Sequence, residues 1–169
     1  MFFSGSPYVL RALNPNDADT LQHFFYSHDE DTIYQRYGHP LKVMTDQDAL
    51  RLVSVDQSCD LALGLFEVGS DGEILNAVGR YCLDRSGLRA EAAFVVRENK
   101  RRQGLASCLL NELIQIARAR GLQALWASVL IGNIPMIRGL KKFGFRETYR
   151  DNDGIEFEFP IQAPDSKTP

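Results

Sequence analysis

The sequence predicts an α/β (α+β) fold, with a mixed, mostly antiparallel central sheet flanked by helices. Two pairs of strand-like runs, at 61–83 and 145–159, are each joined by a turn rich in glycine and aspartate, which predicts antiparallel hairpins. Between the hairpins, an apolar strand leads into a glycine turn and a long amphipathic helix. Strands and helices alternate without an internal repeat, so we expect them to share one sheet.

The N-terminal part predicts one strand and two helices. Tyr8 to Ala12 has the pattern of a short strand, and the turn at 14–17 begins a helix through Leu21. The segment Ser27 to Pro40 is polar with interleaved tyrosines, which indicates an irregular stretch or a broken helix at the rim. Thr45 is expected to cap a second helix.

The middle of the chain predicts a hairpin, a buried strand and a helix. Leu61 to Val68 and Ile74 to Leu83 are strands joined by a Gly-Ser-Asp-Gly turn. Glu91 to Val96 is apolar after its first residue, as expected for a strand near the centre of the sheet and buried on both faces. Leucines then recur at helical spacing from Gly104 until Gly121 ends the helix.

The C-terminal part repeats the strand and helix pattern and closes with the second hairpin. Leu122 to Ile131 is the next strand, and Asn133 has the character of an N-cap with Pro135 in the first helical turn. Gly144 ends this helix. The hairpin at 145–159 then completes the sheet.

The composition is that of an ordinary globular protein. The chain has 169 residues, 44% of them hydrophobic and 24% charged, with a net charge of −3. We expect a single domain over residues 1–162, because a chain of this length buries about 70% of its unfolded surface. A tail at 163–169, rich in Pro, Ser, Thr and Lys, is expected to be disordered. The charge balance argues against nucleic-acid binding.

Other classes of site and location are also disfavoured. No apolar run is long enough to span a bilayer, and the first residues lack the features of a secretion signal. We therefore expect a cytoplasmic protein with no membrane contact. Three cysteines without CxxC spacing and three histidines without ligand spacing predict free thiols and no metal site. Monomer and homodimer both stay open.

The turn at 100–106, Lys-Arg-Arg-Gln-Gly-Leu-Ala, is the strongest functional signal. A helix that begins behind such a turn leaves its first backbone N–H groups unpaired, and the helix dipole and nearby cations favour an anion there. The residues alone therefore predict a phosphate-binding turn. The plain alternative is a solvated charge run next to an ordinary core strand.

A family resemblance follows from the spacing of several motifs. Arg101-x-x-Gly104-x-Ala106 after a strand ending in valine, then Asn133 and finally Gly144-Phe145, resembles the GNAT superfamily of N-acetyltransferases. The chain is most similar to the acetyltransferase domain of bacterial protein-lysine acetyltransferases, through LRALNPNDADTLQHFF, SHDEDTIYQRYGHP, SVDQSCDLALGLF and AEAAFVV. The resemblance implies the GNAT fold, acetyl-CoA as co-substrate and an amine as acceptor.

The resemblance suggests a partner for each part of acetyl-CoA. The pantetheine is expected to pair like an added strand along Phe94, Val95 and Val96, and Asn133 to contact the pantetheine or the thioester. The pyrophosphate is expected on the turn, where glycine allows close approach and two arginines add charge. The turn residues assigned to it are Arg101, Arg102, Gln103, Gly104, Leu105 and Ala106.

Transfer to an amine favours a general base, because a lysine with a pKa near 10.4 costs roughly 4–5 kcal/mol to deprotonate at pH 7. Glu91 is the candidate, since it opens the apolar strand beside the expected thioester position. Its distance from Gly104 also resembles that of the catalytic glutamate of protein-lysine acetyltransferases. The alternative is a strand-end glutamate in a surface ion pair, for instance with Arg89 or Arg80.

Many members of the family use a tyrosine of the last helix as general acid, but Leu140 occupies that position here. A CoA thiol with a pKa near 8.5 can leave without such an acid, and Tyr149 and Tyr81 are candidate substitutes. The sequence thus predicts direct acetyl transfer to a protein lysine. Two alternatives stay open: a small-amine acetyltransferase, with an acidic rim at 29–31, and a non-catalytic acyl-CoA sensor.

Overall fold

The computed structural model describes residues 1–70 and 72–161. Its strands are β1 (Phe2–Phe3), β2 (Ser6–Ala12), β3 (Leu61–Gly69), β4 (Gly72–Leu83), β5 (Arg89–Val96), β6 (Ala124–Leu130), β7 (Arg146–Arg150) and β8 (Gly154–Pro160). In this part of the chain they form an eight-stranded sheet in the order β1-β2-β3-β4-β5-β6-β8-β7. Only β5 and β6 run parallel; the other neighbours are antiparallel. The predicted fold class is confirmed.

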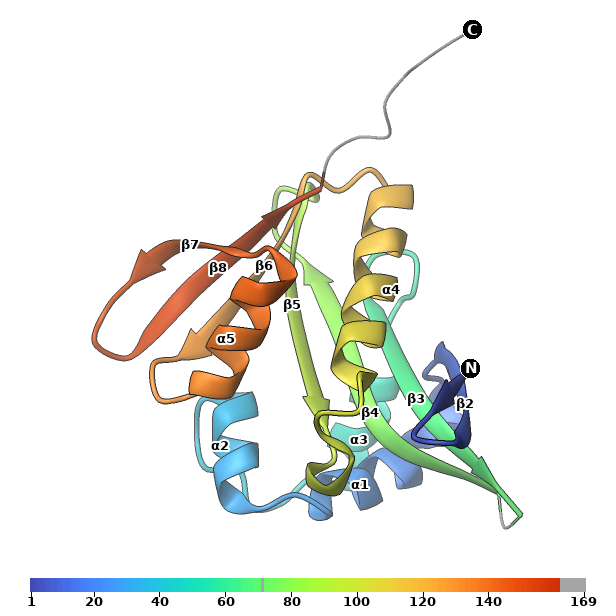
Figure 1. Cartoon of the computed structure of the whole chain (residues 1–169). Coiled ribbons are helices and arrows are strands. Elements are labelled where there is room, and N and C mark those ends of the chain that lie inside the picture. The colour runs from blue at the N-terminus through green and yellow to red at the C-terminus, as the bar shows by residue number, and fades with distance from the viewer. Residues whose placement is uncertain (71, 162–169) are drawn as a thin grey trace, which may run out of the picture.

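Helices cover both faces of this sheet (Figure 1). They are α1 (Ala18–Tyr26), α2 (Glu30–Tyr37), α3 (Asp46–Val53), α4 (Leu105–Ala119) and α5 (Ile134–Phe143), with 3-10 turns η1 (Pro15–Asp17) and η2 (Glu98–Lys100). Leucines of α4 and Leu140 of α5 pack on one face, around Tyr81 and Phe157. Side chains of α1, α2 and α3 pack on the opposite face, around Phe66. Two hydrophobic cores therefore hold the sheet between them.

Both predicted hairpins are present, as are the helix ends read from the sequence. Asn133 caps α5 by accepting a hydrogen bond from the backbone N–H of Met136 at 3.2 Å. Gly144 and Gly121 follow their helices with positive φ, where glycine carries no steric cost. Thr45 caps α3 together with Asp48.

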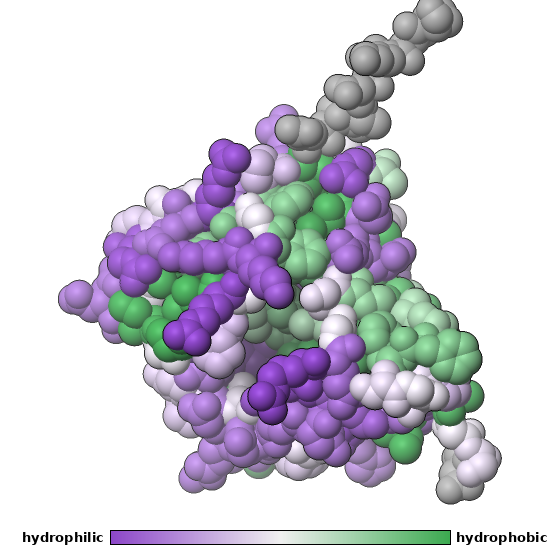
Figure 2. All heavy atoms as spheres, in the orientation of Figure 1, coloured by the Kyte–Doolittle hydropathy of each residue, from purple (hydrophilic) through white to green (hydrophobic). Residues whose placement is uncertain are grey.

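The N-terminal strand β1 was not predicted, because a two-residue strand has no periodicity to read. It pairs with β2, and the ring of Phe3 meets the ring of Tyr8 edge-on, with centroids 5.3 Å apart. Phe2 is exposed. Figure 2 shows hydrophobic surface in the region where Figure 1 places the N-terminus.

The expectation of an irregular stretch or a broken helix at 27–40 was wrong for its middle part, because residues 30–37 form the regular helix α2, whereas 27–29 and 38–40 lie outside it. Asp29 caps it by accepting from the N–H of Thr32 at 2.7 Å, and Gly38 ends it with a φ of 75°. Only Thr32 and Ile33 are buried. Because Ile33 is the one buried apolar residue of the helix, the spacing of its hydrophobic residues is too weak a signal to predict the helix.

The expected burial of β5 on both faces was also wrong in part. Ala90, Ala92 and Val96 are buried towards α4, but Glu91 on the other face is exposed. The difference arises because this second face borders a pocket, described below, rather than a closed core.

Two further expectations concern other features of the chain. Among residues 1–70 and 72–161, no helix is long and apolar enough to cross a membrane. Cys59, Cys82 and Cys108 are free thiols. Residues 1–70 and 72–161 contain no metal-binding cluster of His, Cys, Asp and Glu. The continuous sheet agrees with one domain over 1–162, which stays a proposal. The predicted tail at 163–169 lies outside the described residues.

Candidate active site

The two parallel strands at the centre of the sheet separate after a short stretch of pairing. β5 and β6 are in register only over Arg89–Glu91 and Ala124–Trp126. Beyond that, β5 continues along β4 as far as Val96, and β6 continues along β8 as far as Leu130. The sheet therefore opens between the two strands, starting at Glu91.

The backbone of β5 presents hydrogen-bonding groups to this opening. Arg97 donates its N–H to Asn76 on β4, and Leu88 accepts from Gln123 on the β6 side. Successive residues of a strand direct their peptide groups to opposite edges. Phe94 and Val96 therefore face the opening, whereas the peptide groups of Val95 face β4. An extended ligand arm could pair with β5 here as an added strand.

The turn before α4 has the backbone shape of an anion site. Arg102 and Gly104 both have positive φ, 61° and 94°, so the chain curls before the helix begins. Within the described ranges, 1–70 and 72–161, no side chain caps the first turn of α4. Its backbone N–H groups, including those of Leu105 and Ala106, are thus free of a side-chain acceptor at the positive end of a 15-residue helix. The Leu105 side chain is buried, so only its backbone serves such a site.

Two basic residues hold this turn in place. Lys100 contacts Glu67 on β3 at 2.6 Å, and this hydrogen bond lowers the pKa of Glu67 to about 2. Arg101 donates to Thr32 on α2 at 2.8 Å and to the carbonyl of Val96 at 3.3 Å. These contacts anchor the loop to three different elements.

Arg102 is exposed and differs from Lys100 and Arg101, because it has no ion pair among residues 1–70 and 72–161. Gln103 donates to the carbonyl of Asn99 at 3.3 Å and stays within the loop. Of the basic residues in the turn, Arg102 is the one whose charge is available to an incoming anion.

Asn133 lies on the other side of the opening, between β6 and α5. Its side-chain oxygen is engaged as the cap of α5, and its amide nitrogen remains as a donor. The preceding Gly132 approaches Gln35 of α2, whose Nε2 would lie 4.0 Å from a Cβ at that position. Helix α2 therefore borders the same end of the opening.

Glu91 occupies the point where the opening begins, opposite Trp126 on β6 and Cys82 on β4. Neither expected ion-pair partner contacts it: Arg89 pairs with Glu158 at 2.9 Å, and Arg80 donates to the carbonyl of Leu52. Burial raises the pKa of Glu91 above its usual value, against the opposing effect of the Arg36 charge. A carboxylate with a raised pKa, still partly open to solvent, is suited to accept a proton near neutral pH.

Neither Tyr81 nor Tyr149 lies at the position of Leu140 in α5, where other members of the family are expected to carry the general acid. Leu140 itself is 1% exposed and packs in the core on the α4 face. Tyr81 is buried in that same core and accepts a hydrogen bond from Arg120 at 2.8 Å, on the face opposite to Glu91. Tyr149 is exposed on β7, opposite Glu156 on β8.

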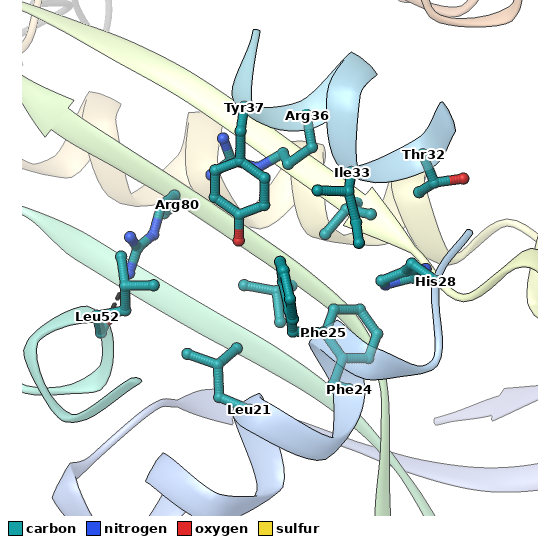
Figure 3. A pocket seen from close by; sticks show the side chains of 12 residues that line it. Leu21, Phe24, Phe25, His28, Thr32, Ile33, Arg36, Tyr37, Leu52 and Arg80 are labelled. Carbon is teal, nitrogen blue, oxygen red and sulfur yellow. Dashed lines mark hydrogen bonds between the residues drawn. The ribbon is translucent and has the colours of Figure 1, made fainter. Parts of the chain in front are cut away.

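A pocket lies on the Glu91 side of the sheet, between α1, α2, α3 and the strands β4 and β5 (Figure 3). Together with its mouth it encloses about 460 Å³ of empty space. Apolar side chains make up most of its wall, with His28, Thr32, Arg36, Tyr37 and Arg80 as the polar members. Arg80 and Val95 place this pocket on the face of the sheet that also carries Glu91.

None of these polar pocket residues was predicted as a site residue. Arg36 and Tyr37 lie on α2, the helix whose regularity the sequence did not reveal. Arg80 had a readable signal: strand alternation places it on the same face as Val78 and Cys82, and Cys82 pairs with Glu91.

The chain matches a known protein family in sequence and several solved structures in fold. A family model described as acetyltransferase (GNAT) domain matches residues 8–146. Among solved structures, the chain is similar to the GNAT domain of S. lividans PAT, with 24% identity, a TM-score of 0.85 and 95% of each chain covered. A candidate acetyltransferase of Salmonella typhimurium, solved with its cofactor acetyl-CoA, has 16% identity, a TM-score of 0.74 and coverage of 95% and 98%.

A third similar structure is the ribosomal-protein-S18-alanine N-acetyltransferase of Escherichia coli. It has 20% identity and a TM-score of 0.67, with 96% of this chain and 99% of that chain covered. At these identities, the likeness to the three structures shows a shared fold.

Proposed function

The chain belongs to the acetyltransferase (GNAT) domain family, and from this premise we propose that it transfers the acetyl group of acetyl-CoA to the side-chain amine of a protein lysine. One observation carries the proposal: the opening between β5 and β6 joins Glu91 at its start to the glycine turn at its far end. The known structure of a similar protein with acetyl-CoA agrees with this choice of co-substrate. The choice of lysine rests on the resemblance of the sequence to protein-lysine acetyltransferases.

For acetyl-CoA, we infer the following arrangement. The pyrophosphate binds the backbone N–H groups of Arg102 through Ala106, with the Arg102 charge beside it. The pantetheine pairs with the backbone of Phe94 and Val96, with Val95 between them, and Asn133 donates its amide to the other side. Arg101 contributes mainly by holding the loop, through its bonds to Thr32 and Val96.

For the reaction, we infer direct attack of the amine on the thioester. Glu91 accepts a proton from the ammonium, the nitrogen forms a bond to the carbonyl carbon, and the carbon–sulfur bond breaks. A backbone N–H of β5 polarises the carbonyl oxygen. The thiolate leaves without a side-chain acid, because Leu140 offers no proton and a thiol of pKa near 8.5 is a good leaving group. The second proton leaves the nitrogen after the attack and passes through solvent to the thiolate, so the products are the acetylated amine, CoA as the thiol and the proton held by Glu91.

The pocket beside Glu91 favours a second candidate, a small-molecule amine acetyltransferase. Its wall combines mostly apolar side chains with a few polar groups, which is the usual composition of a small-molecule site. A small amine would enter this pocket as a whole molecule, whereas a protein lysine would insert only its side chain.

Radiolabelled acetyl-CoA separates these candidates and the non-catalytic sensor. The wild-type protein is incubated with a denatured and a native cell lysate in one arm and with a panel of small amines in the other. Label on proteins that is lost in Glu91→Gln supports the proposal. Label only on small amines replaces it with the second candidate. Tight binding of acetyl-CoA with no transfer in either arm would identify a sensor.

A further inference from the structure

Two arginines in the pocket form no ion pair within the part of the chain that the structure describes. We propose that Arg36 and Arg80 form a subsite for a carboxylate group of the acceptor, close to the amine that receives the acetyl group. The inference rests on the proposed function, because it assumes that the acceptor reaches Glu91 through this pocket. It adds a chemical class: an amine that carries a nearby carboxylate.

The two arginines lie beside the proposed base. Arg80 stands opposite Ala93 on the paired strands, and Cys82 stands opposite Glu91. Two residues along a strand span about 7 Å. Arg36 comes from α2 and lines the same pocket as Arg80, and its charge acts on both Glu91 and Arg80. A carboxylate held here would therefore be within several bonds of an amine at Glu91.

Neither guanidinium forms an ion pair in the described part of the chain, although the Glu91 charge acts on Arg36 and the Asp60 charge on Arg80. Among residues 1–70 and 72–161, no carboxylate lies within 4 Å of Arg36 or Arg80. Arg36 lies over the ring of Tyr37 at 5.1 Å, and Arg80 donates to the carbonyl of Leu52. A guanidinium has five N–H donors arranged as a fork that matches a carboxylate. Most of these donors thus remain free in the described part of the chain.

The surroundings make this arrangement costly unless an anion is bound. Burial lowers the pKa of both arginines, and the Arg36 charge lowers that of Arg80 further. The wall beside them is formed by apolar side chains such as Leu21, Phe25 and Leu52. Two like charges at an apolar wall repel each other and lose hydration, and a shared carboxylate would offset both effects.

The depth of the pocket favours a carboxylate over a larger anion. The space in which a water-sized group fits is about 30 Å³, roughly two water positions. The two oxygens of a carboxylate match this size, whereas a phosphate brings a third and a fourth oxygen.

A second observation points to a ligand in the same pocket. The His28 side chain is 4% exposed, and its Nε2 has no hydrogen-bond partner in the described residues. Its Nδ1 lies 3.4 Å from Glu98, and burial lowers its pKa, which favours the neutral ring at pH 7. Buried polar atoms are nearly always hydrogen-bonded. The pocket therefore presents unmatched polar groups both at its arginines and at His28.

Binding of product-like probes tests the subsite without requiring turnover. In the presence of CoA, calorimetry compares N-acetylated amino acids with their carboxamides, and acetyl-lysine peptides carrying Asp or Glu next to the acetyl-lysine with their Asn or Gln versions. We expect the carboxylate form to bind at least tenfold tighter in one of the two arms. The arm in which this occurs identifies the source of the carboxylate as a free amino acid or an acidic protein segment.

Variants then assign the effect to the two arginines. Arg80→Gln and Arg36→Gln should each reduce the preference to within twofold, and Arg80→Lys, which keeps the charge but not the fork, should retain only part of it. Arg85→Gln removes an equal charge at an exposed position and should keep the full preference. If Arg80→Gln does not fold, because its bond to Leu52 is lost, the other two variants still decide.

Equal binding of carboxylate and carboxamide in both arms would overturn the inference, as would a preference that survives both Gln substitutions. Acetyl transfer to the unacetylated forms of the same probes separates this result from the fate of the proposed function. A binding preference without transfer leaves the subsite but removes the transferase. Transfer with no preference for the carboxylate removes the subsite but leaves the transferase.

Discussion

Replacing Glu91 by glutamine removes the proposed base while keeping the size and most of the polarity of the side chain. A positioned general base contributes about 10²- to 10⁴-fold to a rate. We expect a loss near 10²-fold in kcat/KM at pH 7, at the lower end, because Glu91 is partly open to solvent and water can replace it in part.

The pH profile gives this prediction its sharpest form. At pH 7 only about 1 in 2,500 lysine side chains is neutral, since the pKa is near 10.4, and this fraction rises tenfold with each pH unit. The Glu91→Gln variant depends on that fraction, so its rate should rise about 100-fold from pH 7 to pH 9. The wild-type rate should rise only until Glu91 is deprotonated, at a pH shifted upwards by the burial that raises its pKa. The two rates should therefore converge near pH 9.

The assay is continuous detection of free CoA thiol with the acceptor identified by the labelling experiment. Glu112→Gln on α4 is the matched control, because α4 packs on the face of the sheet opposite to Glu91. It removes the same charge and should leave the rate unchanged. Calorimetry must show the same affinity for acetyl-CoA in all three proteins. A Glu91→Gln rate within twofold of wild type at pH 7, or two parallel pH profiles, would refute the role of Glu91 as base.

Three other predictions concern the cofactor opening and its supports. Gly104→Ala places a side chain at a φ of 94°, so it should weaken acetyl-CoA binding, measured as the Kd by calorimetry, at least tenfold. Gly87→Ala introduces a similar strain at a φ of 69° in the β4–β5 turn, and it should leave this Kd unchanged. Asn133→Ala should lower the free energy of unfolding by about 1 kcal/mol and the affinity for acetyl-CoA several-fold. Asn133→Ser keeps a capping oxygen, so it should lower the affinity without lowering the stability. An unchanged affinity in both variants would mean that Asn133 serves only as a helix cap. Glu67 has a folded pKa of about 2, below its unfolded value, so its contribution to stability is present above about pH 4.5 and is lost as the pH falls towards 2. The free energy of unfolding from urea titrations should therefore fall by about 1 kcal/mol more in wild type than in Glu67→Gln over that range. Equal falls would contradict the role of the Lys100–Glu67 pair.

The parts of the fold that sequence could predict are those in which one local pattern decides the structure. Leu109 and Leu113 at helical spacing indicated α4, and the caps Asn133 and Gly144 marked the ends of α5. Helix α2 could not be predicted in this way, because Ile33 is its one buried apolar residue and Tyr37 is only partly buried against the core. The two-residue strand β1 is defined by its pairing with β2 and by no pattern of its own.

The candidate site divides in the same way. The glycine turn is continuous in sequence, so Arg102 and Gly104 could be assigned from it. The anchoring of that turn could not, since Lys100 reaches Glu67 on β3 and Arg101 reaches Thr32 on α2, at sequence separations of 33 and 69. The arginine pair likewise needs the packing of α2 on β4, which no local pattern encodes.

The central claim is that acetyl-CoA occupies the opening between β5 and β6, with its acyl end at Glu91. A crystal structure of the protein with acetyl-CoA, or with a non-hydrolysable analogue, tests it most directly. We predict the pyrophosphate on the N–H groups of Arg102 through Ala106, the pantetheine beside Phe94 and Val96, and the carbonyl carbon within reach of an amine held by Glu91. A cofactor bound elsewhere, or one bound with its thioester away from Glu91, would contradict the account.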